Sequence, residues 1–352
     1  MIGDPDPPPL CDGPFPALPP GVAPTGQPIR SVLVLRGGAL GDFVLTLPAL
    51  ALLRSAFPGA RIELIAHPGI GSLANPPYVE RVLSIESAAL AGFFVRDAEL
   101  DSALSTYVGG FDCVVSYLHD PEGVFESNVR RCGVSVFIRA FGFPADRHAA
   151  LQWGEPLRQL GLVLASSESR IELCELDYKD CEIRARQAGQ FPLLAVHPGS
   201  GSPRKNWPLE HWLELLEYFL EKWPSGGLRI IGGEADRAQI SLLRSAFSRL
   251  DARVEMWEDV AHRTLAARLS LCDFFVGHDS GVSHVAVAVQ TPSLLLFGPT
   301  DPAVWAPTGT RVRILQSRNL LMGGLDVKEV REALEDALGK IHSCQSGALS
   351  GE

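Results

Sequence analysis

The stretch from Asp273 to Pro302 combines residue types in a spacing that suits binding of an anion. An apolar run at 274–276 ends in Gly-His-Asp-Ser-Gly at 277–281, and a run with helical spacing follows. A helix that begins after Gly281 would direct its free backbone N–H groups and the positive end of its dipole at the loop. Phosphate is the usual occupant of such a site. This stretch therefore predicts a phosphate site.

Three side chains would line that site, namely Asp279, Ser280 and His284. Each of them also has a simpler interpretation. Asp279 or Ser280 could serve only as the N-cap of the helix, and a single histidine in a first helical turn could be structural. The functional interpretation therefore depends on whether other loops of the chain supply further ligand-binding residues.

A second loop with suitable chemistry follows the apolar run at 193–196 and reads HPGSGSPRKNWP. Its glycines and serines, Ser200 among them, offer backbone and hydroxyl donors, and Arg204 and Lys205 add positive charge. It is not a Walker A loop, because G-x-x-x-x-G-K-[ST] is absent. The loop predicts a second phosphate contact, and the alternative is a solvated basic turn.

An acidic side chain lies between these two loops in the sequence. Glu234 comes just after the apolar run at 228–231, where a ribose diol could donate hydrogen bonds to its carboxylate. Asp236 is the better candidate for capping the helix that follows, which leaves Glu234 free for a ligand.

The first half of the chain has a glycine loop of its own. The apolar run at 31–35 is followed by RGGALGD, in which Gly41 lets the backbone approach a ligand and Asp42 places a carboxylate at the helix start. Asp42 could alternatively be only a cap. The glycines do not form G-x-G-x-x-G, and the acid about twenty residues later, Glu63, lies inside the next strand, so NAD binding is disfavoured.

The elements that carry these loops alternate between strand and helix, which predicts an α/β fold with parallel sheets. Proline at position 48 should kink the first helix or delay its start. The expected strands are 31–35, 61–66, 82–85, 113–117, 135–138, 193–196, 228–231, 254–257, 274–276, 293–297 and 312–315. The expected helices are 43–57, 98–108, 122–131, 149–160, 177–188, 208–223, 238–247, 264–271, 282–289 and 327–338.

A polar segment at 163–192 interrupts the alternation and suggests a domain boundary. We predict a disordered proline-rich tail at 1–28 and two Rossmann-like domains, at 29–175 and 176–352. Ligands of open α/β sheets bind at the carboxyl ends of the strands, where all the loops above lie. Two such domains facing each other would enclose a cleft.

Composition narrows the class of protein. The 352 residues are 46% hydrophobic and 20% charged, which suits about two domains, and the net charge of -10 disfavours general nucleic-acid binding. The seven cysteines have no C-x-x-C or metal-ligand spacing, as in a reducing cytoplasm. No apolar stretch reaches the length of a membrane span, and the first 28 residues do not form a secretory signal.

One cluster of arginines could form a local basic patch or be ordinary surface residues: Arg130, Arg131, Arg139, Arg147 and Arg158.

Four segments together resemble glycosyltransferase family 9, the ADP-heptose:lipopolysaccharide heptosyltransferases and their relatives. They are LRGGALGDFVLTLPAL at 35–50, HPGSGSPRKNWPLEHW at 197–212, IGGEADR at 231–237 and GHDSGVSHVAVAVQTPSLLLFGPTDPAVWAP at 277–307. The resemblance implies a GT-B fold with the active site between two Rossmann-like domains, an acceptor-side domain at 29–175 and a nucleotide-sugar-binding domain at 176–352. It also implies inverting, metal-independent transfer of a heptose or related sugar from an ADP-activated donor, with no cofactor.

The resemblance further implies roles for individual residues. Asp42 matches the family's proposed catalytic base, Lys205 its diphosphate-contacting lysine, and Glu234 lies near its ribose-binding acid. The phosphate loop and its helix are matched by Asp279, Ser280, Gly281 and His284, although His278 replaces the family's usual asparagine.

The implied acceptor is the lipopolysaccharide core or another glycan, free or lipid-linked. We expect a cytoplasmic protein with at most peripheral contact at the inner face of the membrane, and no nucleic-acid partner. Two alternatives keep the fold but change the activity: a nucleotide-sugar epimerase of GT-B type, and a nucleotide-sugar-binding protein that does not catalyse transfer.

Overall fold

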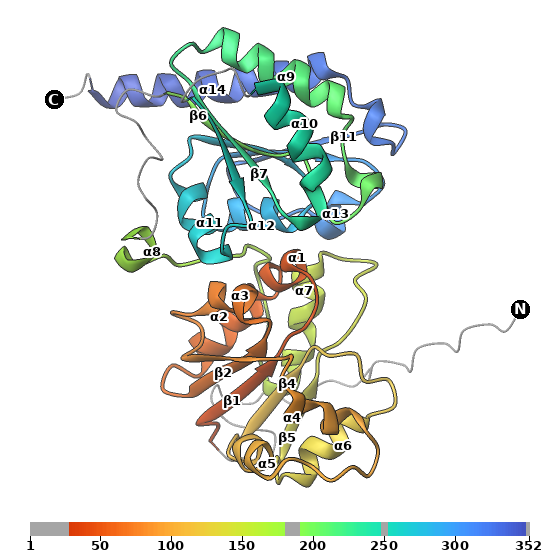
Figure 1. The fold of residues 1–352 in the computed structure, drawn as a ribbon. Coiled ribbons are helices and arrows are strands. Elements are labelled where there is room, and N and C mark those ends of the chain that lie inside the picture. The colour runs from red at the N-terminus through yellow and green to blue at the C-terminus, as the bar shows by residue number, and fades with distance from the viewer. Residues whose placement is uncertain (1–27, 180–190, 248–252, 350–352) are drawn as a thin grey trace, which may run out of the picture.

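The computed structural model describes residues 28–179, 191–247 and 253–349, with side chains described up to Ile341. These residues form two α/β units that face each other (Figure 1). The expected tail lies almost entirely outside the described residues. Of the helix expected at 177–188, only α8, Glu175–Lys179, is described, and the rest of that prediction lies outside the described residues.

The first unit contains a five-stranded parallel sheet with the order β3-β2-β1-β4-β5. Its strands are β1 Ser31–Leu35, β2 Arg61–Ala66, β3 Arg81–Ser84, β4 Cys113–Ser116 and β5 Val136–Arg139. All five residues of β1 are buried, as expected for the central strand of a parallel sheet that is covered on both faces. The glycine loop leaves this strand at the point where the strand order reverses, between β1 and β4.

The second unit contains a six-stranded parallel sheet with the order β11-β10-β9-β6-β7-β8. Its strands are β6 Leu193–His197, β7 Gly227–Gly232, β8 Val254–Glu258, β9 Phe274–His278, β10 Ser293–Phe297 and β11 Val312–Gln316. This is the doubly wound order, in which ligands bind where the order reverses. The reversal falls between β6 and β9, which pair with His197 opposite Gly277. Both predicted phosphate loops therefore start at this point.

Helices cover the sheets largely where the sequence predicts them. In the first unit they are α1 Leu40–Val44, α2 Leu47–Ala56, α3 Pro68–Gly71, α4 Ala88–Ala91, α5 Ser102–Gly109, α6 Val124–Arg131 and α7 Ala149–Gly154. In the second they are α9 Leu209–Lys222, α10 Arg237–Phe247, α11 His262–Ser270, α12 Gly281–Ala288, α13 Pro302–Trp305 and α14 Val327–Leu349. The single helix expected at 43–57 is divided, and Pro48 lies in the first turn of α2, where its missing N–H costs no hydrogen bond. The last helix is longer than expected.

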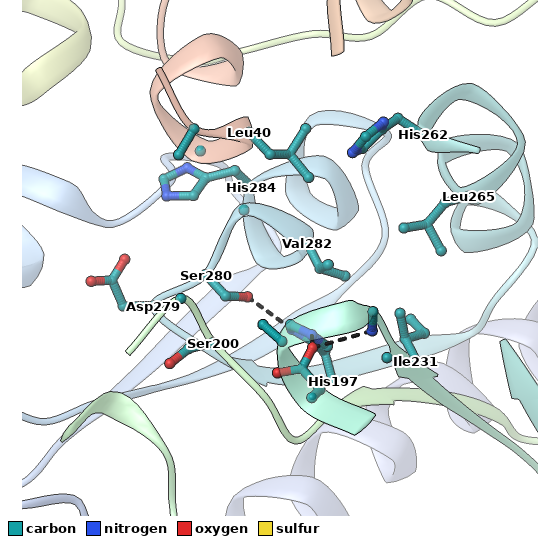
Figure 2. A pocket seen from close by; sticks show the side chains of 18 of the residues that line it. Leu40, His197, Ser200, Ile231, His262, Leu265, Asp279, Ser280, Val282 and His284 are labelled. Atoms are coloured by element: carbon teal, nitrogen blue, oxygen red, sulfur yellow. Dashed lines mark hydrogen bonds and ion pairs between the residues drawn. The ribbon is translucent and has the colours of Figure 1, made fainter. Parts of the chain in front are cut away.

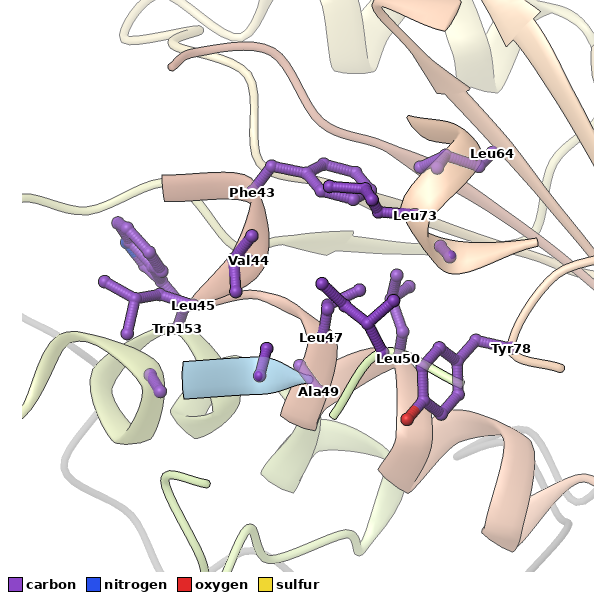
Figure 3. Close-up of a cluster of buried hydrophobic side chains, with 14 of the residues drawn as sticks. Phe43, Val44, Leu45, Leu47, Ala49, Leu50, Leu64, Leu73, Tyr78 and Trp153 are labelled. Atoms are coloured by element: carbon purple, nitrogen blue, oxygen red, sulfur yellow. The ribbon is translucent and has the colours of Figure 1, made fainter. Parts of the chain in front are cut away.

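The two units contact each other through α1 and α12 (Figure 1). A Cβ atom added to Gly281 would come within 2.7 Å of Leu40 Cβ and 3.0 Å of the Gly41 nitrogen, so only glycine permits this approach. The largest buried apolar cluster continues across the junction, from α2 residues such as Leu50 to α12 residues such as Val285. Figure 3 shows its first-unit part, with α1 and α2 packed beside Leu64 and Trp153.

The sheets fall on either side of the domain boundary expected between residues 175 and 176, and that boundary itself stays a prediction. None of the helices in the described part of the chain is both long enough and apolar enough to span a membrane.

Candidate active site

A cavity of about 870 Å³ lies between the two units. The first unit supplies the glycine loop and α1, including Gly41 and Asp42. The second supplies the loops after β6, β7, β8 and β9, and the start of α12 (Figure 2). The volume suits a ligand larger than a single sugar. Each of these loops, taken alone, could be explained as a helix cap or a turn. In the structure they all line the same cavity.

The start of α12 faces this cavity. The Ser280 hydroxyl caps the helix by accepting from the Ser283 N–H at 3.4 Å, and Gly281 and Val282 line the cavity beside it. Lys205 reaches the same place from the loop after β6, with its Nζ 2.7 Å from Asp279 Oδ2. Asp279 is buried, whereas Lys205 keeps about a third of its side chain exposed. A cation and a helix N-terminus thus stand together, with an internal carboxylate holding the cation in place.

Two buried polar atoms in the cavity wall have no hydrogen-bond partner in the described part of the chain, His284 Nδ1 and Thr300 Oγ1. Unsatisfied buried polar atoms are uncommon and mark places where a ligand or water is expected to bind. Burial lowers the pKa of His284 to about 4, with Asp279 opposing the shift, so this imidazole is neutral at pH 7. It can donate or accept a hydrogen bond there without adding charge.

A buried chain of hydrogen bonds lies beneath the phosphate loop, centred on His197 at the end of β6. Its Nδ1 lies 3.0 Å from the Ser280 hydroxyl (Figure 2). Its Nε2 lies 3.1 Å from Asp236 Oδ2. Burial alone would raise the pKa of Asp236, but the hydrogen bond and charge of His197 and the Gly233 N–H bring it below its ordinary value. The chain ties the ends of β6 and β9 to the short turn Glu234–Asp236.

His278, at the end of β9, fixes the position of the lysine-bearing loop. Its Nε2 accepts from the Trp207 N–H at 3.0 Å, so Nδ1 carries the proton and donates to the Gly199 carbonyl at 3.2 Å. The ring is fully buried, and burial lowers the pKa of His278 to about 3. His278 is thus a neutral imidazole that joins both ends of the loop to the sheet.

Asp42 lies at the mouth of the cavity on the first-unit side. Its carboxylate makes no hydrogen bond or ion pair with any described residue, and α1 has no side-chain cap, so the capping interpretation is wrong. The backbone of Asp42 is held instead: its carbonyl accepts from Arg36 at 3.1 Å and from the Thr46 hydroxyl at 2.8 Å. A carboxylate with a fixed backbone and free oxygens is suited to accept a proton from a ligand.

Arg36 is buried, and its guanidinium lies 4.3 Å from the centre of the Trp153 ring and donates to the Thr46 hydroxyl at 2.9 Å. Burial lowers the pKa of Arg36, and the charges of Asp42 and Tyr117 oppose this. The residue therefore acts as a cation stacked between aromatic rings that holds the backbone of Asp42.

Most of the predicted site residues line the cavity. They are Gly41, Asp42, Ser200, Lys205, Asp279, Ser280, Gly281 and His284. Arg204 and Glu234 are exposed and do not line it, and Asp236, which the sequence favours as a cap, does. The Ser200 hydroxyl is bonded to Ser202 and Asn206 within its own loop, so its first role is to shape that loop.

Sequence reasoning missed several residues of this site. His197 belongs to a His-Pro-Gly turn that also occurs at 67–69, so the motif by itself does not single it out. Thr300 and Arg36 lie in loops and do not belong to a helix or strand pattern or to a recognised motif. A polar residue directly after a buried parallel strand is the one signal that could have marked Arg36 and His197.

Across residues 28–179, 191–247 and 253–349, no group of three or more His, Cys, Asp or Glu side chains is arranged to hold a metal ion. In those residues the cavity offers positive charge through Lys205 and the α12 N-terminus. These groups are the ones available to stabilise a phosphate.

The sequence profile of glycosyltransferase family 9 (heptosyltransferase) matches residues 138–326, which is more than half of the chain. The chain belongs to glycosyltransferase family 9. The resemblance inferred from the four sequence segments is thereby confirmed, and this family 9 protein is a glycosyltransferase.

Relatives extend over nearly the whole length. Lipopolysaccharide heptosyltransferase 1 of Salmonella typhimurium is 25% identical over 337 residues, covering 88% of this chain and 99% of that protein. Lipooligosaccharide heptosyltransferase 2 of Haemophilus influenzae is 28% identical over 145 residues, covering 39% of this chain and 40% of that protein.

Solved structures agree with the fold of this family 9 enzyme. A family 9 glycosyl transferase from Veillonella parvula superimposes with a TM-score of 0.70 at 19% identity, covering 88% of this chain and 97% of that one. Escherichia coli heptosyltransferase WaaC with ADP gives a TM-score of 0.67 at 18% identity, covering 87% and 99%. The prediction of two Rossmann-like domains in a GT-B fold is confirmed.

We predict that Arg36→Met lowers kcat of this glycosyltransferase about tenfold while donor KM changes little, since the substitution frees the Asp42 backbone without touching the phosphate loop. Loss of the donors to Thr46 and Asp42 should also lower the free energy of unfolding by roughly 2 kcal/mol. Steady-state kinetics and urea unfolding measure both effects. Arg54 is the matched control, because it binds the Tyr78 and Ala60 carbonyls away from the cavity. If Arg54→Met lowered kcat equally, Arg36 would have only a structural role.

We also predict that burial of His278 makes the folded protein less stable as the pH decreases. The buried imidazole of the folded protein has a pKa of about 3, whereas the imidazole of the unfolded chain takes up a proton near pH 6.5. The contribution of His278 to the free energy of unfolding is therefore complete above pH 6.5 and is lost as the pH falls toward 3. His278→Gln should make the dependence shallower by about 1.4 kcal/mol per pH unit in that window. Urea unfolding between pH 7.5 and 5 tests this. His119→Gln, at an exposed position, should leave the slope unchanged; an unaltered slope in His278→Gln would contradict the prediction.

Proposed function

We propose that this protein is an inverting, metal-independent heptosyltransferase that takes a heptose from ADP-heptose. The observation that carries the proposal is the opposition of Asp42 to Lys205 and the α12 N-terminus across one cavity. A proton acceptor on one domain and an anion site on the other are the two groups that glycosyl transfer from a nucleotide diphosphate requires.

In the proposed reaction, an acceptor hydroxyl attacks the anomeric carbon of the heptose from the face opposite the diphosphate. The new C–O bond forms as the bond to the phosphate oxygen breaks, so the anomeric configuration inverts. The hydroxyl proton passes to the Asp42 carboxylate, and ADP leaves with the electron pair. Lys205 and the N–H groups after Gly281 stabilise the charge that grows on the leaving diphosphate.

Lys205 would change partners during this cycle. Its ammonium is 2.7 Å from the buried Asp279 carboxylate. A diphosphate at the start of α12 would share or take over that contact, and His284 and Thr300 offer hydrogen-bonding atoms to the sugar or phosphate oxygens. Apolar side chains of the cavity, Ile231 and Trp257, would accommodate the flat adenine base.

The relatives support a proposal for the acceptor and the cellular location. Several proteins similar over nearly the whole chain are named lipopolysaccharide heptosyltransferases, and we infer that this protein likewise acts on a glycan of the lipopolysaccharide core. Such work would be done in the cytoplasm, with at most peripheral contact at the inner face of the membrane. The predicted ribose contact of Glu234 is kept as part of the proposal, and it requires the exposed side chain to turn toward the donor.

Calorimetric titration with ADP and UDP, each with and without EDTA, tests the donor. We expect selective binding of ADP that EDTA does not change. NMR of the anomeric signals during transfer from ADP-heptose then tests inversion. Preference for UDP, or binding that disappears in EDTA, would keep the fold but overturn this donor. Conversion of the donor to an epimer without an acceptor would favour the epimerase instead.

A further inference from the structure

A histidine joins the two units beside the cavity. His148 caps the start of α7 in the first unit, where its Nδ1 accepts from the Ala150 N–H at 3.3 Å. Because Nδ1 is the acceptor, Nε2 carries the proton and donates to the Ala306 carbonyl of the second unit at 2.8 Å. Ala306 is buried and follows the last residue of α13. One side chain thus caps a helix of one unit and holds the end of a helix of the other.

The two helices that His148 joins carry residues next to the proposed chemistry. Trp305 of α13 lines the cavity, and its ring lies edge-on to that of Trp153 in α7, with the ring centres 6.4 Å apart. Trp153 also packs on the Arg36 guanidinium, which donates to the Asp42 carbonyl. The contact of α7 with α13 therefore lies between the cavity wall of the second unit and the residue that holds the backbone of Asp42.

The other side of the junction is held more firmly. In Figure 1, α11 and α13 lie on either side of α12, which contacts α1. On the α11 side, Arg263 donates to both carboxylate oxygens of Asp177 and, at 2.9 Å, to the carbonyls of Ser72 and Glu172. A bidentate ion pair supported by two carbonyls is stronger than one bond from a neutral imidazole. A rotation about the α1–α12 contact would therefore open the junction on the α7–α13 side.

Such an opening would affect the reaction more than the binding of the nucleotide. Asp42 belongs to the first unit, whereas Lys205 and the start of α12 belong to the second. A general base acts only within hydrogen-bond reach of the hydroxyl that it deprotonates. Misplacement by about 1 Å can slow a reaction roughly 100-fold. Separation of α7 from α13 would move Asp42 away from a donor held by the second unit, while the phosphate contacts of that unit would remain.

We propose that His148 is a positioning residue, whose hydrogen bond to Ala306 holds the two units closed so that Asp42 reaches the acceptor hydroxyl. The proposal rests on the proposed function, because His148 acts through the base assigned there. It predicts an effect on kcat and none on the affinity for ADP.

Two substitutions separate the two hydrogen bonds of the ring. The amide of His148→Asn extends only as far as Nδ1, so it keeps the helix cap and loses the bond to Ala306. The amide of His148→Gln extends as far as Nε2, so it keeps the donor to Ala306 and loses the cap. We expect His148→Asn to lower kcat about tenfold with little change in ADP affinity or thermal midpoint. His148→Gln should keep kcat near normal and lower the thermal midpoint by a few degrees.

The measurements are steady-state kinetics with ADP-heptose and a lipopolysaccharide-core acceptor, calorimetry with ADP, and thermal unfolding. Amide hydrogen exchange adds a test that needs no ligand. Exchange should become faster in α13 of His148→Asn and in the first turn of α7 of His148→Gln, but in α11 of neither variant. His67→Asn is the matched control, because His67 also precedes a helix of the first unit but its ring faces Glu86 of the same unit. This control should leave kcat and the exchange of α13 unchanged.

Several results would overturn the proposal. If both variants lost kcat in proportion to their loss of stability, His148 would have only a structural role. Normal kcat or unaltered exchange of α13 in His148→Asn would show that the bond does not hold the units closed, and weaker ADP binding would mean that His148 acts on the donor. If the unchanged protein transferred no heptose from ADP-heptose, the proposed function would fail, while the exchange experiment would still show whether His148 holds the units together.

Discussion

Asp42→Asn is expected to reduce the rate of transfer from ADP-heptose about 1,000-fold, within the range of general-base catalysis. The asparagine keeps the backbone contacts to Arg36 and Thr46 and occupies nearly the same volume. Because only the proton acceptor is lost, ADP affinity and the thermal midpoint of unfolding should stay close to those of the unchanged protein. Single-turnover kinetics, ADP calorimetry and thermal unfolding together measure this.

The control for this substitution is Asp301→Asn. Asp301 is exposed, does not line the cavity and caps α13, a role that asparagine also fills. Its variant should transfer heptose at the normal rate. Near-normal turnover by a correctly folded Asp42→Asn protein would reject Asp42 as the base, and loss of ADP binding would mean that the residue holds the donor rather than the proton.

Lys205→Ala is expected to weaken ADP binding about 100-fold and to lower kcat as well, because the ammonium contacts the diphosphate before and during its departure. The loss has two sources. The positive charge disappears, and the buried Asp279 carboxylate is left to repel the phosphates. The double variant Lys205→Ala/Asp279→Asn separates the two, since it removes the repulsion and should recover part of the ADP affinity.

Arg204→Ala is the matched control for the lysine. Arg204 is the adjacent cation, but its side chain is exposed and does not line the cavity. Calorimetry with ADP at two salt concentrations should find little change in Arg204→Ala and a weaker salt dependence in Lys205→Ala. If both variants lost the same affinity, the loop would act as a diffuse positive surface, and the specific contact assigned to Lys205 would be wrong.

The positions of the chemical loops could be predicted because they depend on local patterns. Apolar runs such as 193–196 and 274–276 are buried parallel strands, and polar residues directly after them reach one edge of a sheet whatever the details of packing. The division of the first helix at Pro48 follows equally from one residue's missing N–H.

The directions of individual side chains do not follow from these local patterns. Asp236 and Glu234 share one short turn, and the sequence favoured Asp236 as the cap and Glu234 as the ligand contact. In the fold Asp236 points inward to His197 and lines the cavity, while Glu234 is exposed. Two residues apart in a turn, the side chains point in different directions, and the turn's orientation is set by β7 and α10 rather than by its own sequence.

The sequence by itself determined the two parallel sheets, the loops that carry the chemistry and the family to which the chain belongs. Only the tertiary structure decided which atoms meet: Lys205 with Asp279, His197 with Ser280, and Arg36 with the carbonyl of Asp42. The reason is that strand and helix patterns arise from neighbours within a few residues, whereas the first two contacts join segments more than seventy residues apart. Even the short-range one, Arg36 with Asp42, depends on the distant Trp153 ring that holds the guanidinium.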